Sequence, residues 1–404
     1  MANFSLMQQL AQPNGGKIVL LVLDGLGGLP TDDHVSTTLE HADTPNMDRL
    51  AAEGCSGLSH PIARGVTPGS GPAHLALFGY DPVSTPVGRG VLSALGIGFD
   101  LLATDVAARG NFCTVDENGL ILDRRAGRIS SEQAYPLVEM LDQIEVPGVE
   151  TFVRQVKEYR FVLVLRGEGL NGALDDTDPQ AVGKAPLPAK ALNDEARATQ
   201  SFVQSWLDAA RQTLSDQHPA NMVTLRGFAQ DPNLPKFGDA YRLKAACVAV
   251  YPMYKGVSRL VGMDVLDTGA HFGPSEEFQV VADNWDNYDF FFIHIKPTDS
   301  RGEDGDFEAK AKVIESVDKA LPMLLDLQPD VLVITGDHST PARLKSHSWH
   351  PVPTLLWAPA SHLPDTVQRF GERFAQQGGL GHFPAAEIMP MALGHALRLE
   401  KFGA

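Results

Sequence analysis

The stretch from Val331 to His338, VLVITGDH, constrains the fold more than any other part of the sequence. Five residues with strong strand preference lead into Gly336, and Asp337 and His338 follow directly. An uninterrupted apolar run bounded by turn residues is typical of a strand buried in a parallel sheet. Ligands in open α/β sheets bind beyond the carboxyl ends of such strands. An aspartate and a histidine in that position therefore predict a pair of metal ligands.

A second apolar run has the same arrangement more than three hundred residues earlier. Residues 18–23 form a continuous strand pattern that stops at Asp24 and a glycine-rich turn. The segment TPNMDRLAAEG then predicts a helix, with Thr44 as N-cap, Pro45 as first residue and Gly54 as stop. Since strand ends bring distant residues together in a parallel sheet, we expect Asp24 and Asp337 at one edge.

Ser70 lies in TPGSGPAHLALFGYDP, between a Thr-Pro-Gly turn and a short apolar helix over residues 73–78. Free backbone N–H groups and the helix dipole at such a place favour an anion. A simple capping role is the commoner use of serine at a helix start. The glycines on both sides favour the functional interpretation, because they let a bulky group approach the backbone closely.

The bulk composition limits the classes of partner. The net charge of −17 argues against nucleic acid or an anionic membrane. No apolar run reaches the ~18 residues needed to span a membrane, and the N-terminal residues lack a signal-peptide pattern. Three widely spaced cysteines, Cys55, Cys113 and Cys247, favour reduced thiols in a cytoplasmic protein.

The region between the two strand-rich ends has a different pattern of apolar and polar residues. Short β-like runs and the amphipathic helix of residues 191–214 predict a smaller inserted α+β domain over residues 96–280. The core domain would then be discontinuous, with residues 1–95 and 281–404. A single arginine is most often a solvated surface charge. As a set in an acidic protein, the basic residues of this region are expected in part to face phosphate or carboxylate: Arg109, Arg124, Arg125, Arg128, Arg166 and Lys255.

An acidic segment follows the strand-like run of residues 288–295. Asp299 and Glu303 share a helix face if a helical turn begins there, although a solvated acidic turn is an alternative. His347 and His350 follow VLVITGDH in a loop. The candidate ligands offer oxygen and nitrogen but no thiolate, which suits Mn, Mg, Co or Zn, and they suffice for two ions: Asp24, Ser70, Asp299, Glu303, Asp337, His338 and His347.

These motifs closely resemble the 2,3-bisphosphoglycerate-independent phosphoglycerate mutases of the archaeal type, in the alkaline phosphatase superfamily. The resemblance extends over nearly the whole chain, in KIVLLVLDGLGG, TPNMDRLAAEG, TPGSGPAHLALFGYDP, RGNFCTVD, DRRAGRI, HIKPTDSRGEDGDF, TGDHSTP, HSWHPVP and RLEKFGA. It implies an alkaline-phosphatase-like α/β core, with a central, mostly parallel sheet flanked by helices and a second domain inserted after the serine segment. It also implies two divalent metal ions and a phosphoserine intermediate.

Carried over by position, the resemblance assigns a role to each candidate. Ser70 would be the nucleophile, and the arginines of the insert with Lys255 would hold the phosphate and carboxylate of the substrate. One metal site would comprise Asp24, Ser70, Asp337 and His338, and the other Asp299, residue 303 and His347. The chain has Glu303 where the family usually has a histidine, and His350 where an acidic residue is common.

The resemblance implies a cytoplasmic glycolytic isomerase that interconverts 3-phosphoglycerate and 2-phosphoglycerate. The alternative is a related metal-dependent phosphotransferase or phosphatase on another small metabolite, in the manner of a homoserine kinase. A non-catalytic metabolite-binding protein is a third hypothesis, which the retention of Ser70, Asp24, Asp337 and His338 disfavours.

Overall fold

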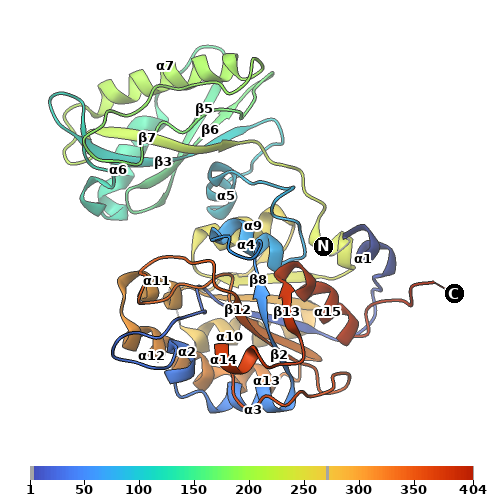
Figure 1. Ribbon diagram of the computed structural model, residues 1–404. Coiled ribbons are helices and arrows are strands. Elements are labelled where there is room, and N and C mark those ends of the chain that lie inside the picture. The colour runs from blue at the N-terminus through green and yellow to red at the C-terminus, as the bar shows by residue number, and fades with distance from the viewer. Residues whose placement is uncertain (1–3, 270–272, 404) are drawn as a thin grey trace. The chain divides into compact units, whose positions relative to one another are not determined.

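The computed structural model describes residues 4–269 and 273–403, which form two compact units (Figure 1). The core unit comprises Met1–Pro86 and Pro235–Ala404, and the inserted unit comprises Val87–Leu234. Each unit has its own sheet and its own buried apolar cluster. Among the described residues, no helix has both the length and the apolar character to cross a membrane.

The core unit is built on an eight-stranded sheet. Its order is β13 (Gly381–Pro384), β2 (Cys55–His60), β12 (Val352–Trp357), β11 (Val331–Thr335), β1 (Ile18–Leu23), β10 (Phe290–Ile295), β8 (Ala245–Ala249) and β9 (Asp264–Val265). Strand β12 is antiparallel to both its neighbours, and the other pairings are parallel. The predicted α/β class with a central, mostly parallel sheet is confirmed.

Helices cover both faces of this sheet. One face packs its apolar side chains against α3 (Pro45–Glu53), α10 (Pro274–Asp283), α12 (Phe307–Ala320) and α13 (Pro322–Leu325). The other face packs through aromatic contacts such as Phe78 on Phe292 and Phe237 on Phe290. It carries α4 (Ser70–Leu77), α8 (Phe237–Tyr241) and α9 (Pro252–Leu260). The remaining helices of the unit are α1 (Phe4–Leu10), α2 (Thr38–His41), α11 (Pro297–Asp304), α14 (Glu372–Ala375) and α15 (Ile388–His395), with short 3₁₀ turns η2 (Trp285–Asn287) and η3 (Ala385–Glu387).

The register of the three central strands brings their carboxyl ends level. Val22 of β1 is opposite both His294 of β10 and Thr335 of β11. The residues that follow each strand therefore leave the sheet at the same edge. This is the arrangement in which open α/β sheets bind ligands.

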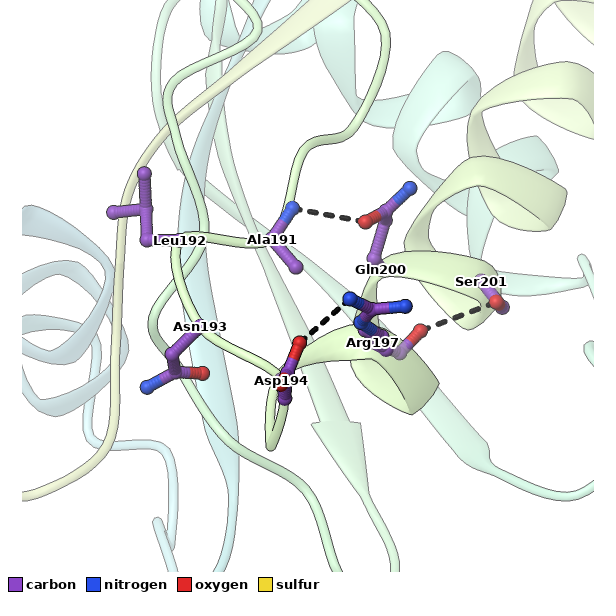
Figure 2. Close-up of a pocket in the computed structure, with 7 residues that line it drawn as sticks. All are labelled: Ala191, Leu192, Asn193, Asp194, Arg197, Gln200 and Ser201. Carbon is purple, nitrogen blue, oxygen red and sulfur yellow. Dashed lines mark hydrogen bonds and ion pairs between the residues drawn. The ribbon is translucent and has the colours of Figure 1, made fainter.

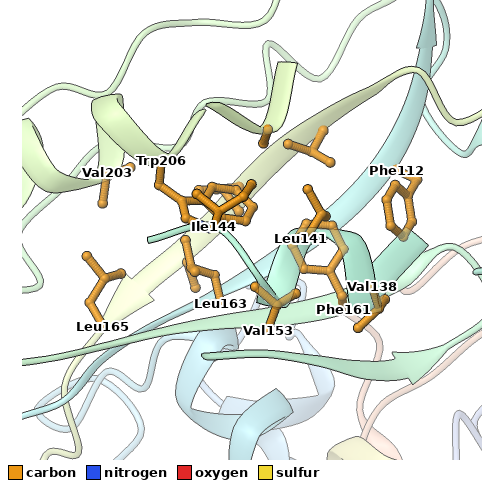
Figure 3. Packing of buried hydrophobic residues seen from close by; sticks show 14 of the residues in the cluster. Phe112, Val138, Leu141, Ile144, Val153, Phe161, Leu163, Leu165, Val203 and Trp206 are labelled. Carbon is orange, nitrogen blue, oxygen red and sulfur yellow. The ribbon is translucent and has the colours of Figure 1, made fainter. Parts of the chain in front are cut away.

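The inserted unit has a separate sheet with antiparallel pairings. Its strands are β3 (Val106–Val115), β4 (Ile121–Asp123), β5 (Glu150–Lys157), β6 (Arg160–Arg166) and β7 (Met222–Ala229). Its helices are α5 (Arg89–Gly96), α6 (Ser131–Asp142) and α7 (Arg197–Leu214), with the 3₁₀ turn η1 (Ala126–Arg128). Figure 3 shows Trp206 of α7 and Leu141 of α6 packed with Phe161 and Leu163 of β6 in its core.

The limits of the inserted unit differ from the expected 96–280 at both ends. Helix α5 starts at Arg89 and packs on β3, so the insert begins earlier. Strand β8 and helix α9 belong to the core unit, because β8 pairs in parallel with β10. The apolar run AACVA predicts a strand, but its composition does not say which of two sheets the strand joins. The predicted helix over residues 191–214 is present from Arg197 onward.

Candidate metal centre and active site

Three buried carboxylates meet where the central strands end. Asp24 follows β1, Asp337 follows β11, and Asp299 lies in the first turn of α11 after β10. The backbone N–H of Gly25 donates to Asp337 Oδ1 at 3.0 Å, which ties the two strand ends together. Gly25 has φ 63°, and a Cβ there would lie 2.5 Å from Thr340 Oγ1. A side chain at position 25 would therefore spread the loops that carry the carboxylates.

His338 lies at the centre of this group. Its Nε2 is 3.3 Å from Asp24 Oδ1, 3.2 Å from Asp337 Oδ2 and 3.3 Å from Ser70 Oγ. Its Nδ1 contacts Thr340 Oγ1 at 3.0 Å, and that hydroxyl donates to Asp299 Oδ1 at 2.6 Å. Because the Thr340 hydroxyl donates its hydrogen to Asp299, it can only accept from His338, so Nδ1 of His338 carries the proton. Nε2 of His338 is then unprotonated and can bind a cation.

Ser70 is the first residue of α4, and Gly69 is its N-cap. The Ser70 hydroxyl is directed to Nε2 of His338. The ring of His74, one turn later, donates from Nδ1 to the Ser70 carbonyl oxygen at 2.8 Å and lies 3.4 Å from Asp337 Oδ2. The structure thus brings together the four residues expected at the first metal site.

A second group forms on the other side of His338. His347 stacks on the His338 ring at a centroid distance of 3.6 Å, and its Nε2 is 3.6 Å from Asp299 Oδ1. Ligand atoms of Asp299, His338 and His347 all lie within 4.8 Å of one another. Glu303 is on α11 one turn after Asp299 but is not in this converging group, and His350 bonds to Ser348. Partial desolvation and the charge of Asp299 raise the pKa of Glu303.

The charges of the centre need further compensation. Burial opposes ionisation of Asp24, but Lys296 at 3.0 Å and the nearby imidazoles hold its pKa well below the ordinary value. Burial and the charge of Asp24 raise the pKa of Asp337 well above the ordinary value. Burial lowers the pKa of His338, which keeps its ring neutral. Lys296 thus pairs with two of the three carboxylates, Asp24 and Asp299.

This donor set fits divalent cations. Asp24 Oδ1 and Asp337 Oδ2 are buried and have no hydrogen-bond donor among the described residues. Buried charges persist in proteins when they are paired or coordinate a metal. Carboxylate oxygens and neutral imidazole nitrogens are the ligands that Mn, Mg, Co and Zn accept. Asp24, Ser70, Asp337, His338, Asp299 and His347 therefore have both the chemistry and the geometry for metal binding.

Tyr254 and His294 complete the centre and are absent from the ligand set expected from the sequence. The Tyr254 hydroxyl donates to Asp24 Oδ2, and its ring stacks on His294 at 3.5 Å. His294 Nε2 lies 3.3 Å from the same oxygen. No periodic pattern marks either residue, because β10 is buried along its whole length and Tyr254 lies in a separate helix, α9.

Lys310 is a fully buried amine that holds the loops of the centre. Its Nζ donates to the carbonyl oxygens of Gly25 at 2.7 Å, Gly27 at 3.2 Å and Thr340 at 2.9 Å. Three donors of one ammonium thus match three acceptors that follow Asp24 and His338 in the chain. The sequence carried a signal for this residue, since Lys310 lies between Phe307, Ala311 and Ile314 on the apolar face of α12.

The basic residues expected to hold substrate do not converge on one point as the metal ligands do. Arg124 pairs with Asp178 at 2.8 Å, and Arg166 pairs with Asp105 at 2.6 Å. Arg125 and Arg128 are exposed near η1. Arg109 of β3 is opposite Arg226 of β7, which pairs with Asp176 and Asp178 and did not figure among the expected residues. Lys255 lies on α9 of the core unit, not in the insert.

A surface hollow in the inserted unit lies apart from these residues. Figure 2 shows its polar lining around the start of α7, where Arg197 pairs with Asp194 at 2.6 Å and Ala191 donates to Gln200 at 2.9 Å. It holds no cluster of histidine or carboxylate ligands among the described residues. The hollow therefore offers no chemistry comparable to that of the strand ends.

Comparison with known proteins adds independent evidence. The family model of 2,3-bisphosphoglycerate-independent phosphoglycerate mutase matches residues 51–221. A protein of Thermosipho melanesiensis is 47% identical over 401 residues, covering 99% of this chain and 98% of its own. One from Thermus thermophilus is 48% identical over 404 residues, covering 99% of both chains. Both are named probable 2,3-bisphosphoglycerate-independent phosphoglycerate mutases.

Solved structures agree with these relatives. The cofactor-independent phosphoglycerate mutase of Thermoplasma acidophilum is 30% identical, with a TM-score of 0.72, and covers 94% of this chain and 100% of its own. A protein from Pyrococcus horikoshii is 32% identical, with a TM-score of 0.83, and covers 96% of this chain and 100% of its own. The similarity thus includes both units and the whole set of strand ends.

Proposed function

The chain belongs to the 2,3-bisphosphoglycerate-independent phosphoglycerate mutase family, and from this premise we propose that Ser70 is the residue that receives the phosphoryl group. The protein is an enzyme of this class with an alkaline-phosphatase-like core. It interconverts 3-phosphoglycerate and 2-phosphoglycerate without added bisphosphoglycerate.

The position of Ser70 carries the proposal. Ser70 is the first residue of α4, and its hydroxyl lies 3.3 Å from Nε2 of His338, beside two buried carboxylates. A serine is a weak nucleophile unless a base or a metal ion activates it. The free N–H groups of the first turn of α4 favour the negative charge of an arriving phosphoryl group.

The transfer requires two in-line steps. In the first, a bond forms between Ser70 Oγ and phosphorus while the bond from phosphorus to the 3-oxygen of the substrate breaks. The serine proton is balanced by the proton that the 3-oxygen gains. In the second step the 2-oxygen of the reoriented glycerate takes the phosphoryl group back, and Ser70 regains its proton. No oxidant, nucleotide or second phosphate donor enters this balance.

The strand-end residues support these steps by holding charge. Asp24, Ser70, Asp337 and His338 would hold one divalent ion, and Asp299 and His347 the other, with Glu303 as a further ligand. Mn, Mg, Co or Zn, when bound, lowers the pKa of the serine hydroxyl and neutralises phosphoryl oxygens. Lys296 pairs with Asp24 and Asp299, Lys310 fixes the loops that carry the ligands, and Thr340 sets the tautomer of His338.

Substrate recognition is assigned to basic side chains. We propose that Arg109, Arg124, Arg125, Arg128 and Arg166 of the insert, with Lys255 of the core unit, hold the phosphate and carboxylate of phosphoglycerate. Arginine suits this role because its planar fork matches both anions. The free cysteines Cys55, Cys113 and Cys247 support a cytoplasmic location.

The alternative, a phosphotransferase or phosphatase on another small metabolite, is not favoured by the named relatives. An assay with ATP and homoserine, run beside the mutase assay, separates the two activities. Purified protein loaded with Mn is expected to convert 3-phosphoglycerate to 2-phosphoglycerate with no bisphosphoglycerate present.

Ser70→Ala tests the assigned nucleophile. The substitution is expected to lower the rate of conversion by roughly 10⁴-fold or more, while Ser84→Ala, at an exposed serine, leaves it unchanged. Mass spectrometry of wild-type protein quenched during turnover is expected to find phosphate on Ser70. Full activity in Ser70→Ala would remove the serine from the mechanism.

A further inference from the structure

Two histidines and a glutamate converge on the surface of the core unit, away from the strand ends. His34 lies in the loop between β1 and α2, His41 in α2, and Glu308 in the first turn of α12. None of the three takes part in the mechanism proposed above. Their side-chain exposures are 26%, 38% and 56%, so solvent reaches each of them.

The three ligand atoms meet at one point. Nε2 of His34 and Nε2 of His41 are each 3.5 Å from the same oxygen, Oε1 of Glu308. Ligand atoms of the three residues all lie within 4.8 Å of one another. Tetrahedral zinc with bonds of about 2.0–2.1 Å separates its ligand atoms by roughly 3.4 Å. The nitrogen–oxygen spacings already match that value.

Aromatic packing fixes the orientation of both rings. His34 stacks on Phe307 with a centroid distance of 4.0 Å and an interplanar angle of 5°. His41 meets the edge of the same phenyl ring at 5.3 Å and 64°. One phenylalanine, next to Glu308 in the chain, thus holds both imidazoles toward the carboxylate. A ligand set that is already ordered loses little entropy when an ion binds.

The backbone beneath each ligand is also fixed. Thr31 and His34 exchange two hydrogen bonds, of 2.9 Å and 3.1 Å, which close the loop around His34. Helix α2 has a capping box made by Thr37 and Glu40, and Asp306 caps α12 through the N–H of Ala309. The three ligands therefore come from three separately anchored segments.

We propose that His34, His41 and Glu308 form a further binding site for a divalent transition metal ion such as Zn²⁺. Two imidazole nitrogens and one carboxylate oxygen are a known zinc ligand set, with the fourth position open to water. The net charge of −17 favours a cation at the surface. The ion ties the loop that follows Asp24 to the start of α12.

Zinc binding in equilibrium dialysis, measured by elemental analysis, tests this site. Wild-type protein is expected to bind one more zinc ion per chain than His41→Gln or Glu308→Gln. The melting temperature of wild type is expected to rise more with added zinc than that of either variant, since an ion bound only to the folded state stabilises it. Mutase activity with Mn is expected to be the same in all three proteins.

His395→Gln is the matched control, because it removes a histidine that contacts Ser361 and belongs to no converging group among the described residues. It is expected to bind as much zinc as wild type. Equal zinc content in wild type, His41→Gln and Glu308→Gln would overturn the proposal and leave an ordinary histidine–glutamate ion pair. Glu308→Gln alters an exposed helix start, so it keeps the test valid if His41→Gln fails to fold.

Discussion

The buried centre at the strand ends and the cluster of His34, His41 and Glu308 use the same ligand chemistry in different surroundings. Asp24, Asp337 and His338 are fully buried, whereas the cluster is open to water. Ligands that lack water must have their charges balanced within the protein. The centre accordingly has Lys296, Tyr254 and Thr340 around it, whereas the rings of the cluster pack on Phe307 and need no charged partner beyond Glu308.

Helix α12 connects the two regions. Glu308 and Lys310 are two residues apart, a spacing that puts side chains on different sides of a helix. Glu308 faces the exposed histidines, while Lys310 faces inward and holds the carbonyl groups beside Asp24 and His338. Burial thus decides how much supporting structure a set of metal ligands requires.

Asp337→Asn breaks the buried centre while leaving the cluster intact. The amide keeps the shape of the side chain but removes its charge, so the rate of mutase turnover is expected to fall by roughly 10³-fold. The protein is expected to lose one tightly bound ion from the centre and to keep zinc binding at the cluster. Elemental analysis and the 3-phosphoglycerate assay measure both effects. Near-normal turnover would mean that Asp337 is no ligand.

Lys310→Met tests whether the centre depends on the lysine beneath it. Removal of the amine leaves three buried carbonyl groups without their donor, which is expected to cost on the order of 3 kcal/mol of unfolding free energy. It should also weaken Mn binding, because the loops that carry Asp24 and His338 lose their common anchor. Urea denaturation and Mn titration measure the two effects.

The control for this change is Lys312→Met, at an exposed lysine on the same helix. It is expected to change stability by less than about 0.5 kcal/mol. If both methionine variants were equally stable, the hydrogen bonds of Lys310 would make no net contribution to the free energy of unfolding.

Glu372→Gln tests the segment of chain between Asp24 and His41 through the pH dependence of the free energy of unfolding. Glu372 accepts hydrogen bonds from Gly28 N–H and the Thr37 hydroxyl, and burial raises its pKa to about 7. Because this pKa lies above the ordinary 4.5, the folded state binds more protons between pH 4.5 and 7, and stability falls as pH rises through that window.

The glutamine variant does not lose this stability at high pH, because glutamine does not titrate. Relative to wild type it is expected to gain about 2 kcal/mol between pH 5 and pH 8, a figure reduced for partial exposure of the residue. Denaturant unfolding of both proteins at the two pH values measures the difference. A difference that stays constant with pH would show that Glu372 is ionised across the whole range.

Glu303→His is expected to have the smallest effect and sharpens the description of the second ion. A nitrogen ligand in place of a carboxylate favours Zn over Mn, so the ratio of the two affinities is expected to rise by about tenfold or less. Asp304→His, at the exposed neighbouring position, is the control and should leave the ratio unchanged. The same ratio in both variants would exclude residue 303 from the coordination sphere.

Local patterns in the sequence predicted much of the core. Helix α3 has the predicted N-cap Thr44 and the predicted end at Gly54, and β1 occupies residues 18–23 as expected. Asp24, Asp337 and His338 were predicted to share one edge, because parallel strands end together, and the family resemblance placed Ser70 with them. The compact unit of the insert has other limits than those expected, since β8 pairs with a strand that lies 45 residues later in the chain.

Strand and helix patterns depend on neighbours along the chain, so the elements and the residues at their ends could be predicted from the sequence alone. The tertiary structure decided which side chains support those ends. The Tyr254 hydroxyl contacts Asp24 across 230 residues of sequence, and Lys310 contacts Gly25 across 285. His34, His41 and Glu308 likewise converge only through folding. Such contacts depend on the packing of distant segments, which no local pattern of polarity records.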